Sequence, residues 1–395
     1  GPGCRWVGNE NGFAGATNWS FLRAGEVYPG YPKYRELQYG HADGNQWVAA
    51  ECDVSIRPGW FYHPEEDNRV KTVEQLTDLY YRSVGHNATL LLNFPVDRNG
   101  LIHPVDSANA VDFHKNIQKQ LAHNLLSGVV AEVSDERGGK YTAKAMTDND
   151  YDTYWATNDD VTSATIEFDL PQAEKINRMM LQEYIPLGQR VKSFVVEYNQ
   201  AGEWLPVKLN EETTTIGYKR LLRFETITTD KIRVRFTDSR ACLCINNIEA
   251  YYAGETSDTY TAKAAELKSY PFTLVGVDVE EAQKGMDKND QTTCFINGNT
   301  LLIDLGEERT ITSFHYLPDQ SEYNKGLIAA YEISVGTDSN AVNQVVAKDE
   351  FSNIKSNPIL QSVYFTPVKA RYIQLKATRM IHDGEPMGLA EIGIQ

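Results

Sequence analysis

The sequence predicts a multidomain protein in which part of a (β/α)8-like barrel, residues 1–126, is followed by two antiparallel β-sandwiches, residues 127–253 and 254–395. Three observations support this prediction. The 395 residues suit two or three domains better than one. Apolar runs alternate with helical patterns in the first part, whereas short strands of alternating polarity follow it. The order of those strands and their loops then repeats in the last part.

The first part shows the alternation of strands and helices. Val73–Ser83 (VEQLTDLYYRS) places apolar residues at helical spacing. Residues 89–94 (TLLLNF) form a short continuous apolar run, which predicts a strand buried on both faces of a parallel sheet. Residues 106–126 predict a closing helix. This rhythm is typical of a (β/α) barrel, in which chemistry lies at the carboxyl ends of the strands.

The remaining residues carry a duplicated sandwich pattern. Residues 164–168, 193–198 and 231–236 alternate apolar and polar side chains between turns, which predicts an antiparallel sandwich. Short polar linkers are expected at 127–140 and 253–262. Four segments match in the same order, which indicates an internal duplication. The matches are 148–155 with 287–294, 166–170 with 301–305, 231–239 with 370–378, and 248–250 with 390–392.

Composition excludes some classes of partner. The net charge of −16 and the lack of a Lys/Arg block argue against nucleic acid. No run of 18 apolar residues exists, so no membrane span is predicted. The 22 tyrosines and 6 tryptophans suit contacts with carbohydrate, and equally suit a β-rich protein. The five cysteines have no metal-ligand spacing, which favours mostly buried thiols over a disulfide framework.

Two short segments carry the candidate chemistry. Residues 5–10 (RWVGNE) and 51–63 (ECDVSIRPGWFYH) crowd carboxylates, an arginine and aromatic rings between glycines and prolines. This mixture suits a sugar, because rings stack on its C–H faces and charged groups bind its hydroxyls. Glu10 is the candidate acid, or else a capping or salt-bridged glutamate. The glycines at 8 and 12 suit a tight loop that presents this carboxyl.

Each of the other candidate site residues has two interpretations. Glu51 is a rival acid or a buried partner of Arg57, and Asp53 is expected to form a bidentate pair with Arg57. Arg57 alternatively binds sugar hydroxyls, and Trp60 stacks on the sugar or fills a core. His63 contacts a sugar hydroxyl, and Trp19 and Trp47 line the subsite of a branched sugar, or else these side chains pack inside the protein. Trp6 and Trp19 could also form an apolar wall beside Glu10.

Residues 5–10, 47–63 and 83–95 together resemble the C-terminal part of a family 29 α-L-fucosidase, and the segment 6–10 followed by Trp19-Ser20 resembles its α-1,3/1,4-specific branch. The duplicated units resemble discoidin-type jelly-roll modules, of the F5/8 type C or family 32 carbohydrate-binding kind. The resemblance implies a retaining exo-glycosidase that acts on Lewis-type fucosylated oligosaccharides, with Glu10 as acid/base and no metal or cofactor in the chemistry.

The resemblance also implies a nucleophile that residues 1–395 do not contain. The family's nucleophile is an aspartate in a Trp-Phe-Asp-Gly-type motif, and no aspartate has this context here. It is therefore expected upstream of Gly1, since 1–126 would supply about half of a barrel. Two alternatives are a non-catalytic carbohydrate-binding fragment and a relaxed-specificity α-L-fucosidase. The substrate class implies a bacterial periplasmic or extracellular location. The oligomeric state stays open.

The β-sandwich segments hold a second kind of candidate site. Asp148, Asp150 and Thr153 resemble a structural calcium loop, with Glu249 from the last strand nearby. The alternative is an Asx-rich turn without an ion. Asp287, Asn289 and Thr292 keep the pattern in the last part, with Lys288 inside the loop. Tyr184, Tyr218 and His382 are candidate sugar platforms, or else ordinary packing residues.

Overall fold

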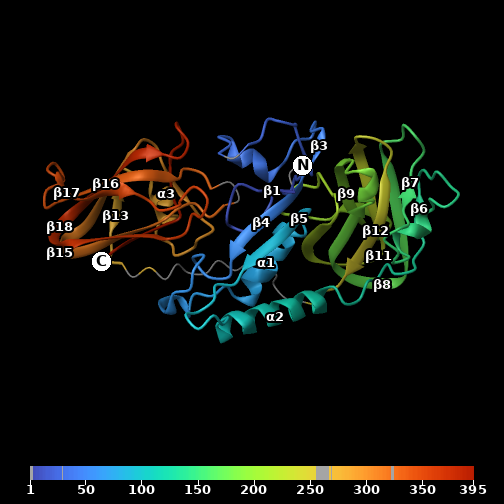
Figure 1. Ribbon diagram of the computed structural model, residues 1–395, viewed down its shortest axis with the longest axis horizontal. Coiled ribbons are helices and arrows are strands. Elements are labelled where there is room, and N and C mark those ends of the chain that lie inside the picture. Colours follow the sequence, from blue (N-terminus) through green and yellow to red (C-terminus); the bar gives the residue numbers. More distant parts are fainter. Residues whose placement is uncertain (1–2, 29, 255–266, 268, 322–323) are drawn as a thin grey trace. The chain divides into compact units, whose positions relative to one another are not determined.

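The computed structural model describes residues 3–28, 30–254, 267, 269–321 and 324–395, and its contacts divide the chain into two compact units, Gly1–Tyr260 and Thr261–Gln395 (Figure 1). The predicted segments 1–126 and 127–253 both lie in the first unit. The linker expected at 253–262 falls largely outside the described residues. All five cysteines are described and free.

The first unit begins with a three-stranded parallel sheet of order β1-β4-β5, backed by helices α1 and α2 (Figure 1). The side chains of the central strand alternate: Ala50, Cys52 and Val54 are buried, whereas Glu51 and Asp53 point to the opposite face. The elements are β1 (Cys4–Trp6), β2 (Phe21–Leu22), β3 (Gln46–Trp47), β4 (Ala49–Ser55), α1 (Val73–Ser83), β5 (Ala88–Asn93) and α2 (Pro104–Gln120).

Helix α1 has its predicted bounds, and helix α2 does not. A capping box fixes the start of α1, because the Thr72 hydroxyl accepts from Gln75 N and the Gln75 side chain accepts from Thr72 N. Helix α2 begins at Pro104 and ends at Gln120, so the predicted end at residue 126 is wrong. Leu126 is fully buried in the core of the first sandwich, where Leu125 N donates to Ala250 O at 2.9 Å.

Strand β5 is buried on one face only, which corrects the expectation of burial on both. Leu90 and Leu92 pack against the core formed by α1 and β4, whereas Leu91 points away and is 51% exposed. Among the described residues β5 pairs with β4 alone, so it forms an edge of this sheet. The three strands run parallel, and within the described residues they do not close into a barrel.

The first sandwich is antiparallel, with sheet order β10-β9-β11-β8-β12-β7 and β6 added on β8. The predicted strands at 164–168, 193–198 and 231–236 are confirmed within β8, β9 and β11. Register shifts in β11 let this long strand continue past the predicted segment. The elements are β6 (Glu132–Val133), β7 (Trp155–Ala156), β8 (Ala164–Glu183), β9 (Val191–Gln200), β10 (Glu203–Pro206), β11 (Arg220–Ser239) and β12 (Cys244–Tyr251).

A polar seam joins the parallel sheet to the first sandwich inside the first unit. Glu211 Oε2 contacts His86 Nε2 at 2.7 Å and Arg220 Nη2 at 3.1 Å. Burial raises the pKa of Glu211, but the charges of Arg220 and His86 outweigh burial and bring it to about 2. Arg220 also donates to Ala16 O, and Asn18 N donates to Thr215 Oγ1 at 2.8 Å.

The second unit repeats the sandwich with sheet order β13-β15-β18-β16-β17, β20 on β15, and a separate β14-β19 pair. Its elements are β13 (Thr273–Val275), α3 (Val279–Gln283), β14 (Cys294–Ile296), β15 (Thr300–Leu317), β16 (Ile328–Gly336), β17 (Gln344–Glu350), β18 (Gln361–Met380), β19 (Met387–Leu389) and β20 (Glu391–Ile394). Short 3-10 turns lie in the first unit at Tyr34–Gln38, Pro64–Glu66, Ala143–Met146 and Ile185–Leu187.

Candidate functional site

Three carboxylates gather toward the carboxyl ends of β1 and β4. Glu51 and Asp53 lie on the same face of β4, and Trp6 at the end of β1 is paired in register with Glu51. Glu10 follows β1 on a short loop. Burial raises the pKa of Asp53 against a lowering hydrogen bond from Trp6, and the charges of Glu10 and Glu51 raise it further. The three groups therefore act on one another electrostatically.

Two indole rings hold two of these carboxylates. Trp60 Nε1 donates to Glu10 Oε2 at 2.6 Å, and Trp6 Nε1 donates to Asp53 Oδ1 at 2.6 Å. Asn93, at the end of β5, donates through its amide to the carbonyl oxygen of Trp60 at 3.1 Å. Sequence reasoning missed Asn93 as a site residue, although its position at a polar strand end could have indicated it.

The loop that carries Glu10 requires its two glycines. Gly8 has φ +82°, and a Cβ there would lie 2.3 Å from Tyr34 O. Gly12 has φ +83°, and a Cβ would lie 2.7 Å from Val54 Cγ1. The Asn9 side chain closes the loop by accepting from Asn11 N at 3.0 Å. The predicted tight loop is therefore confirmed, since only glycine combines this φ with so close a backbone approach.

Arg57 supports the loop of Trp60 and does not pair with Asp53. Its side chain is fully buried and bonds both carboxylate oxygens of Asp106 at 2.8 Å, with Asp67 at 2.9 Å. The expected pairs of Arg57 with Asp53 or Glu51 are therefore wrong, because β4 ends at Ser55 and the chain then turns toward α2. His63 accepts from Arg57 through its carbonyl oxygen at 3.4 Å, and its ring is 55% exposed.

Trp19 and Trp47 lie toward the amino end of β4, away from Glu10. Val48 N donates to Ser20 O, which fastens this segment to the start of the strand. Trp47 to Glu51, the nearer of the two carboxylates on β4, spans four residues of extended chain, about 13 Å. Trp19 is 5% exposed, and Trp47 packs edge-on against Phe21 at 5.2 Å. The structure therefore brings Trp6 and Trp60 to the carboxylates, but neither of these two tryptophans.

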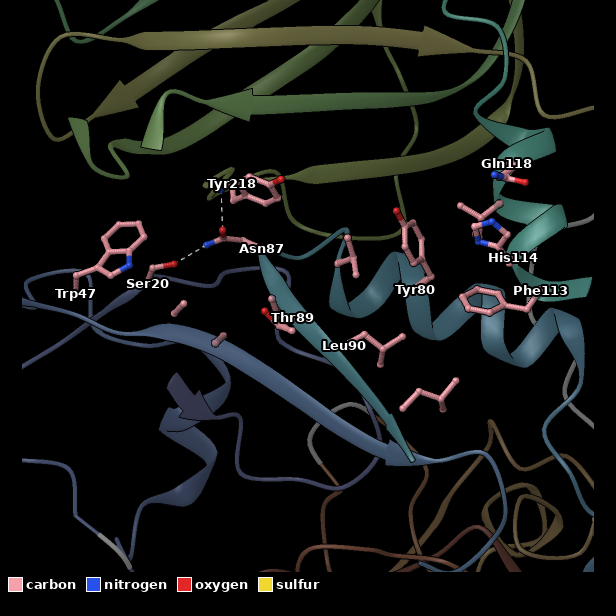
Figure 2. Close-up of a pocket in the computed structure, with 16 residues that line it drawn as sticks. Ser20, Trp47, Tyr80, Asn87, Thr89, Leu90, Phe113, His114, Gln118 and Tyr218 are labelled. Atoms are coloured by element: carbon pink, nitrogen blue, oxygen red, sulfur yellow. Dashed lines mark hydrogen bonds between the residues drawn. The ribbon is translucent and has the colours of Figure 1, made fainter. Parts of the chain in front are cut away.

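Trp47 instead lines a cavity of about 790 Å³ along β5 (Figure 2). Tyr80, Phe113, Leu90 and Leu92 give it a largely apolar wall. Figure 2 shows Asn87 linking the two sides, donating to Ser20 Oγ and accepting from Tyr218 N. Among the described residues that line it, none has a carboxylate, so this cavity offers no acid for glycosidic chemistry.

Of the three candidate sugar platforms, Tyr184 and Tyr218 belong to the first unit and His382 to the second. Tyr218 is 60% exposed at the cavity, whereas Tyr184 stacks on Tyr154 at 4.2 Å. His382 is half-buried in the loop after β18.

The two aspartate-rich loops have the same hydrogen-bond pattern. Thr153 Oγ1 donates to Asp148 Oδ2 at 2.9 Å, and Thr292 Oγ1 donates to Asp287 Oδ2 at 2.9 Å. A residue with left-handed backbone sits at the same place in each loop: Asn149 at φ 61° and Lys288 at φ 60°. The matched loops support the internal duplication. Among the described residues, no three His, Cys, Asp or Glu side chains group as a metal site.

Strand register places Glu249 away from the position of Glu391. Ile248 pairs with Leu181 on β8, and Ile392 pairs with Tyr316 on β15. Leu181 lies as far beyond segment 166–170 as Tyr316 lies beyond the matched segment 301–305. Ile248 and Ile392 are therefore equivalent positions. Glu391 thus corresponds to Asn247, and the match of 248–250 with 390–392 is shifted. Glu249 instead bonds Asn247 at 2.8 Å and the Tyr251 hydroxyl.

The residue that reaches the first loop from β12 is Asn246. Its Nδ2 donates to Tyr151 O at 3.4 Å, while its Oδ1 is buried without a hydrogen-bond partner. In the second unit, Glu391 Oε1 accepts from Asn289 N at 3.1 Å. Burial, with the nearby Asp287 charge, raises the pKa of Glu391 to about 7. Each loop therefore has a side-chain oxygen from the final strands beside it that could serve as a cation ligand, in addition to the predicted residues.

The family model of the F5/8 type C domain matches residues 130–247 and 282–392, more than half of the chain. The chain therefore belongs to the F5/8 type C domain family. Of the helices in the described ranges, none is long and apolar enough to cross a membrane.

The chain is also similar to α-L-fucosidases. It is 36% identical over 234 residues to α-L-fucosidase 1 of Arabidopsis thaliana, covering 57% of this chain and 44% of that protein. A glycoside hydrolase family 29 member from an unknown rumen bacterium is 32% identical, with TM-score 0.54, over 99% of this chain and 62% of that one. A Ruminococcus gnavus family 29 fucosidase solved with fucose is 35% identical, with TM-score 0.58, over 64% and 51%. The chain spans about half the length of the curated relatives it matches.

Proposed function

We propose that these residues belong to an α-L-fucosidase, a retaining exo-glycoside hydrolase in which Glu10 is the acid/base. The observation that carries this proposal is the Glu10 carboxyl, held at 2.6 Å by the Trp60 indole at the carboxyl ends of parallel strands. The similarity to family 29 enzymes supports the same assignment. The parallel sheet and its helices would then be the last part of the catalytic (β/α) barrel.

The proposed reaction is a double displacement. A retaining glycosidase needs two carboxyl groups about 5–5.5 Å apart. Glu10 donates its proton to the glycosidic oxygen as the aglycone leaves, and an aspartate in the Trp-Phe-Asp-Gly-type context attacks the anomeric carbon. Glu10 then removes a proton from the water that releases fucose.

The proposed substrates are α-1,3/1,4-fucosylated oligosaccharides of the Lewis type. The complete protein should cleave a branched trisaccharide bearing galactose beside fucose at least about tenfold faster than a 1,2-linked fucoside, a preference of about 1.4 kcal/mol. Fucose release followed by chromatography measures both rates. Equal rates would indicate a relaxed-specificity fucosidase. Binding without turnover of any fucoside would favour the alternative hypothesis of a non-catalytic carbohydrate-binding protein.

Structural calcium in the two loops is the second part of the proposal. The aspartates, threonine hydroxyls and loop carbonyls are hard oxygen donors of the kind that Ca²⁺ takes, six to eight at a time. Asn246 Oδ1, buried without a partner, fits an additional ligand of the first loop. The Asp287 and Glu391 carboxylates supply two charges to the second loop. Neither ion would take part in the fucosidase chemistry.

Calcium affinity in the second unit should depend on pH through Glu391. With a folded pKa of about 7, Glu391 must lose its proton before it can bind the ion. Affinity should therefore rise about tenfold between pH 6 and pH 8, as calorimetric titration with CaCl₂ would show. Glu391→Gln should remove this dependence, and Asp148→Asn should weaken only the other site. Absence of calcium binding at pH 8 would leave both loops as ion-free Asx turns.

The proposal includes a periplasmic or extracellular location. Fucosylated glycans of the Lewis type are carried on secreted and cell-surface molecules, so an enzyme that acts on them meets its substrate outside the cytoplasm.

A further inference from the structure

The hydrogen bond between Trp60 and Glu10 distinguishes the two oxygens of the acid/base. Trp60 Nε1 reaches Glu10 Oε2 at 2.6 Å, a short contact for an N–H donor. The indole nitrogen has a hydrogen to give and no lone pair to offer. Oε2 must therefore act as the acceptor whenever this bond is made.

The donor itself is held by buried and half-buried groups. The carbonyl oxygen of Trp60 accepts from Asn93 at 3.1 Å, and the same Asn93 amide bonds Ser55 Oγ at 3.1 Å. Below the loop, the fully buried Arg57 side chain bonds Asp106 and Asp67. Two strand ends and an ion-pair cluster therefore determine where the indole N–H points.

A protonated carboxyl has one hydroxyl oxygen and one carbonyl oxygen, and the carbonyl oxygen is the better acceptor. With Oε2 accepting from the indole, the proton of the neutral acid belongs on Oε1. We infer that Trp60 is a positioning residue that directs the transferable proton of Glu10 to Oε1, which would then be the oxygen that protonates the glycosidic bond. The inference rests on the proposed fucosidase function and gives Trp60 a role besides sugar stacking.

Trp60→Phe removes the N–H donor and keeps a smaller aromatic ring, and the Trp6→Phe control below makes the same change in ring size. The proton of Glu10 is then free to reside on either oxygen, and proton transfer to a poor leaving group suffers most. We expect kcat for the branched trisaccharide to fall about 10- to 100-fold, and kcat for an activated aryl fucoside to fall less than threefold, with little change in KM. This dependence on the leaving group is a readout that general loosening of the site would not produce.

Trp6→Phe is the matched control, because it removes the other indole N–H, the one that binds Asp53. It should change both substrates by the same factor. Equal losses on both substrates in Trp60→Phe would overturn the inference while leaving the fucosidase proposal intact. If the unaltered protein cleaves neither substrate, the proposed function itself fails.

A measurement independent of turnover covers the case of a poorly folded variant. The protein has 6 tryptophans, so a ¹H–¹⁵N spectrum gives a small set of indole resonances. Glu10→Gln should shift the resonance that Trp60→Phe removes, and leave that of Trp6 nearly unchanged. An unshifted Trp60 resonance would show that the bond does not form in solution, and would overturn the inference.

Discussion

Replacing Glu10 by glutamine in the complete protein should lower kcat for branched fucosides by about 10²- to 10⁴-fold, the range that general acid catalysis contributes. Glutamine keeps an oxygen that can accept from Trp60 Nε1 and removes the transferable proton. Activated aryl fucosides need little protonation of the leaving group, so their glycosylation step should be largely retained. Steady-state kcat/KM on one substrate of each kind measures the difference, because it reports the glycosylation step alone, whereas loss of Glu10 as base slows release of fucose from both substrates.

Glu51→Gln is the control for this result, because Glu51 is the rival acid on the neighbouring strand. It should lower both rates to a similar extent. If Glu51→Gln instead shows the selective loss, or if Glu10→Gln affects both substrates equally, the acid/base assignment of Glu10 is wrong.

Replacing Asp106 by asparagine should destabilise the first unit by about 3 kcal/mol. The side chains of Arg57 and Asp106 are both 0% exposed, so the substitution leaves a buried guanidinium with only the partly exposed Asp67 as a counter-charge. Denaturant unfolding of the full chain, followed by tryptophan fluorescence, measures the loss. Because Arg57 supports the loop of Trp60, fucosidase activity should decline as well.

The matched control is Asp169→Asn, which breaks a surface pair with Lys231 whose side chains are 57% and 42% exposed. Exposed pairs contribute between about 0 and 1 kcal/mol, so this variant should unfold nearly as the parent does. An Asp106→Asn protein as stable as Asp169→Asn would show that the Arg57 cluster does not hold the fold.

Local signals predicted the local structure well. The Thr72 and Gln75 capping box and the apolar spacing after it determine α1 without help from the rest of the chain. Glycines at 8 and 12 indicated the loop that carries Glu10, because tolerance of a positive φ is a property of glycine itself. The matched threonine–aspartate bonds of the two loops are also local, because each joins residues five apart.

Contacts that depend on tertiary packing could not be predicted in this way. Asp106 lies 49 residues beyond Arg57, on a helix whose approach to the sheet is not encoded in either segment. Trp19 and Trp47 are of a residue type that commonly stacks on sugars, yet the direction of the strand places them away from the carboxylates. Glu249 was matched to Glu391 by sequence, whereas the pairing of Asn247 with Gln182 and of Glu391 with Leu317 shows that the match is shifted by two residues.

The polar seam of the first unit limits how far its sandwich can be treated as an interchangeable module. The backbone that leaves the Glu10 loop is fastened to that sandwich at Ala16 by Arg220 and at Asn18 by Thr215. A graft that replaced the sandwich while keeping the sheet would release this backbone, even if every carboxylate were retained. Within the first unit, the sandwich thus belongs to the frame of the candidate site, and the two would have to be inherited or transplanted together.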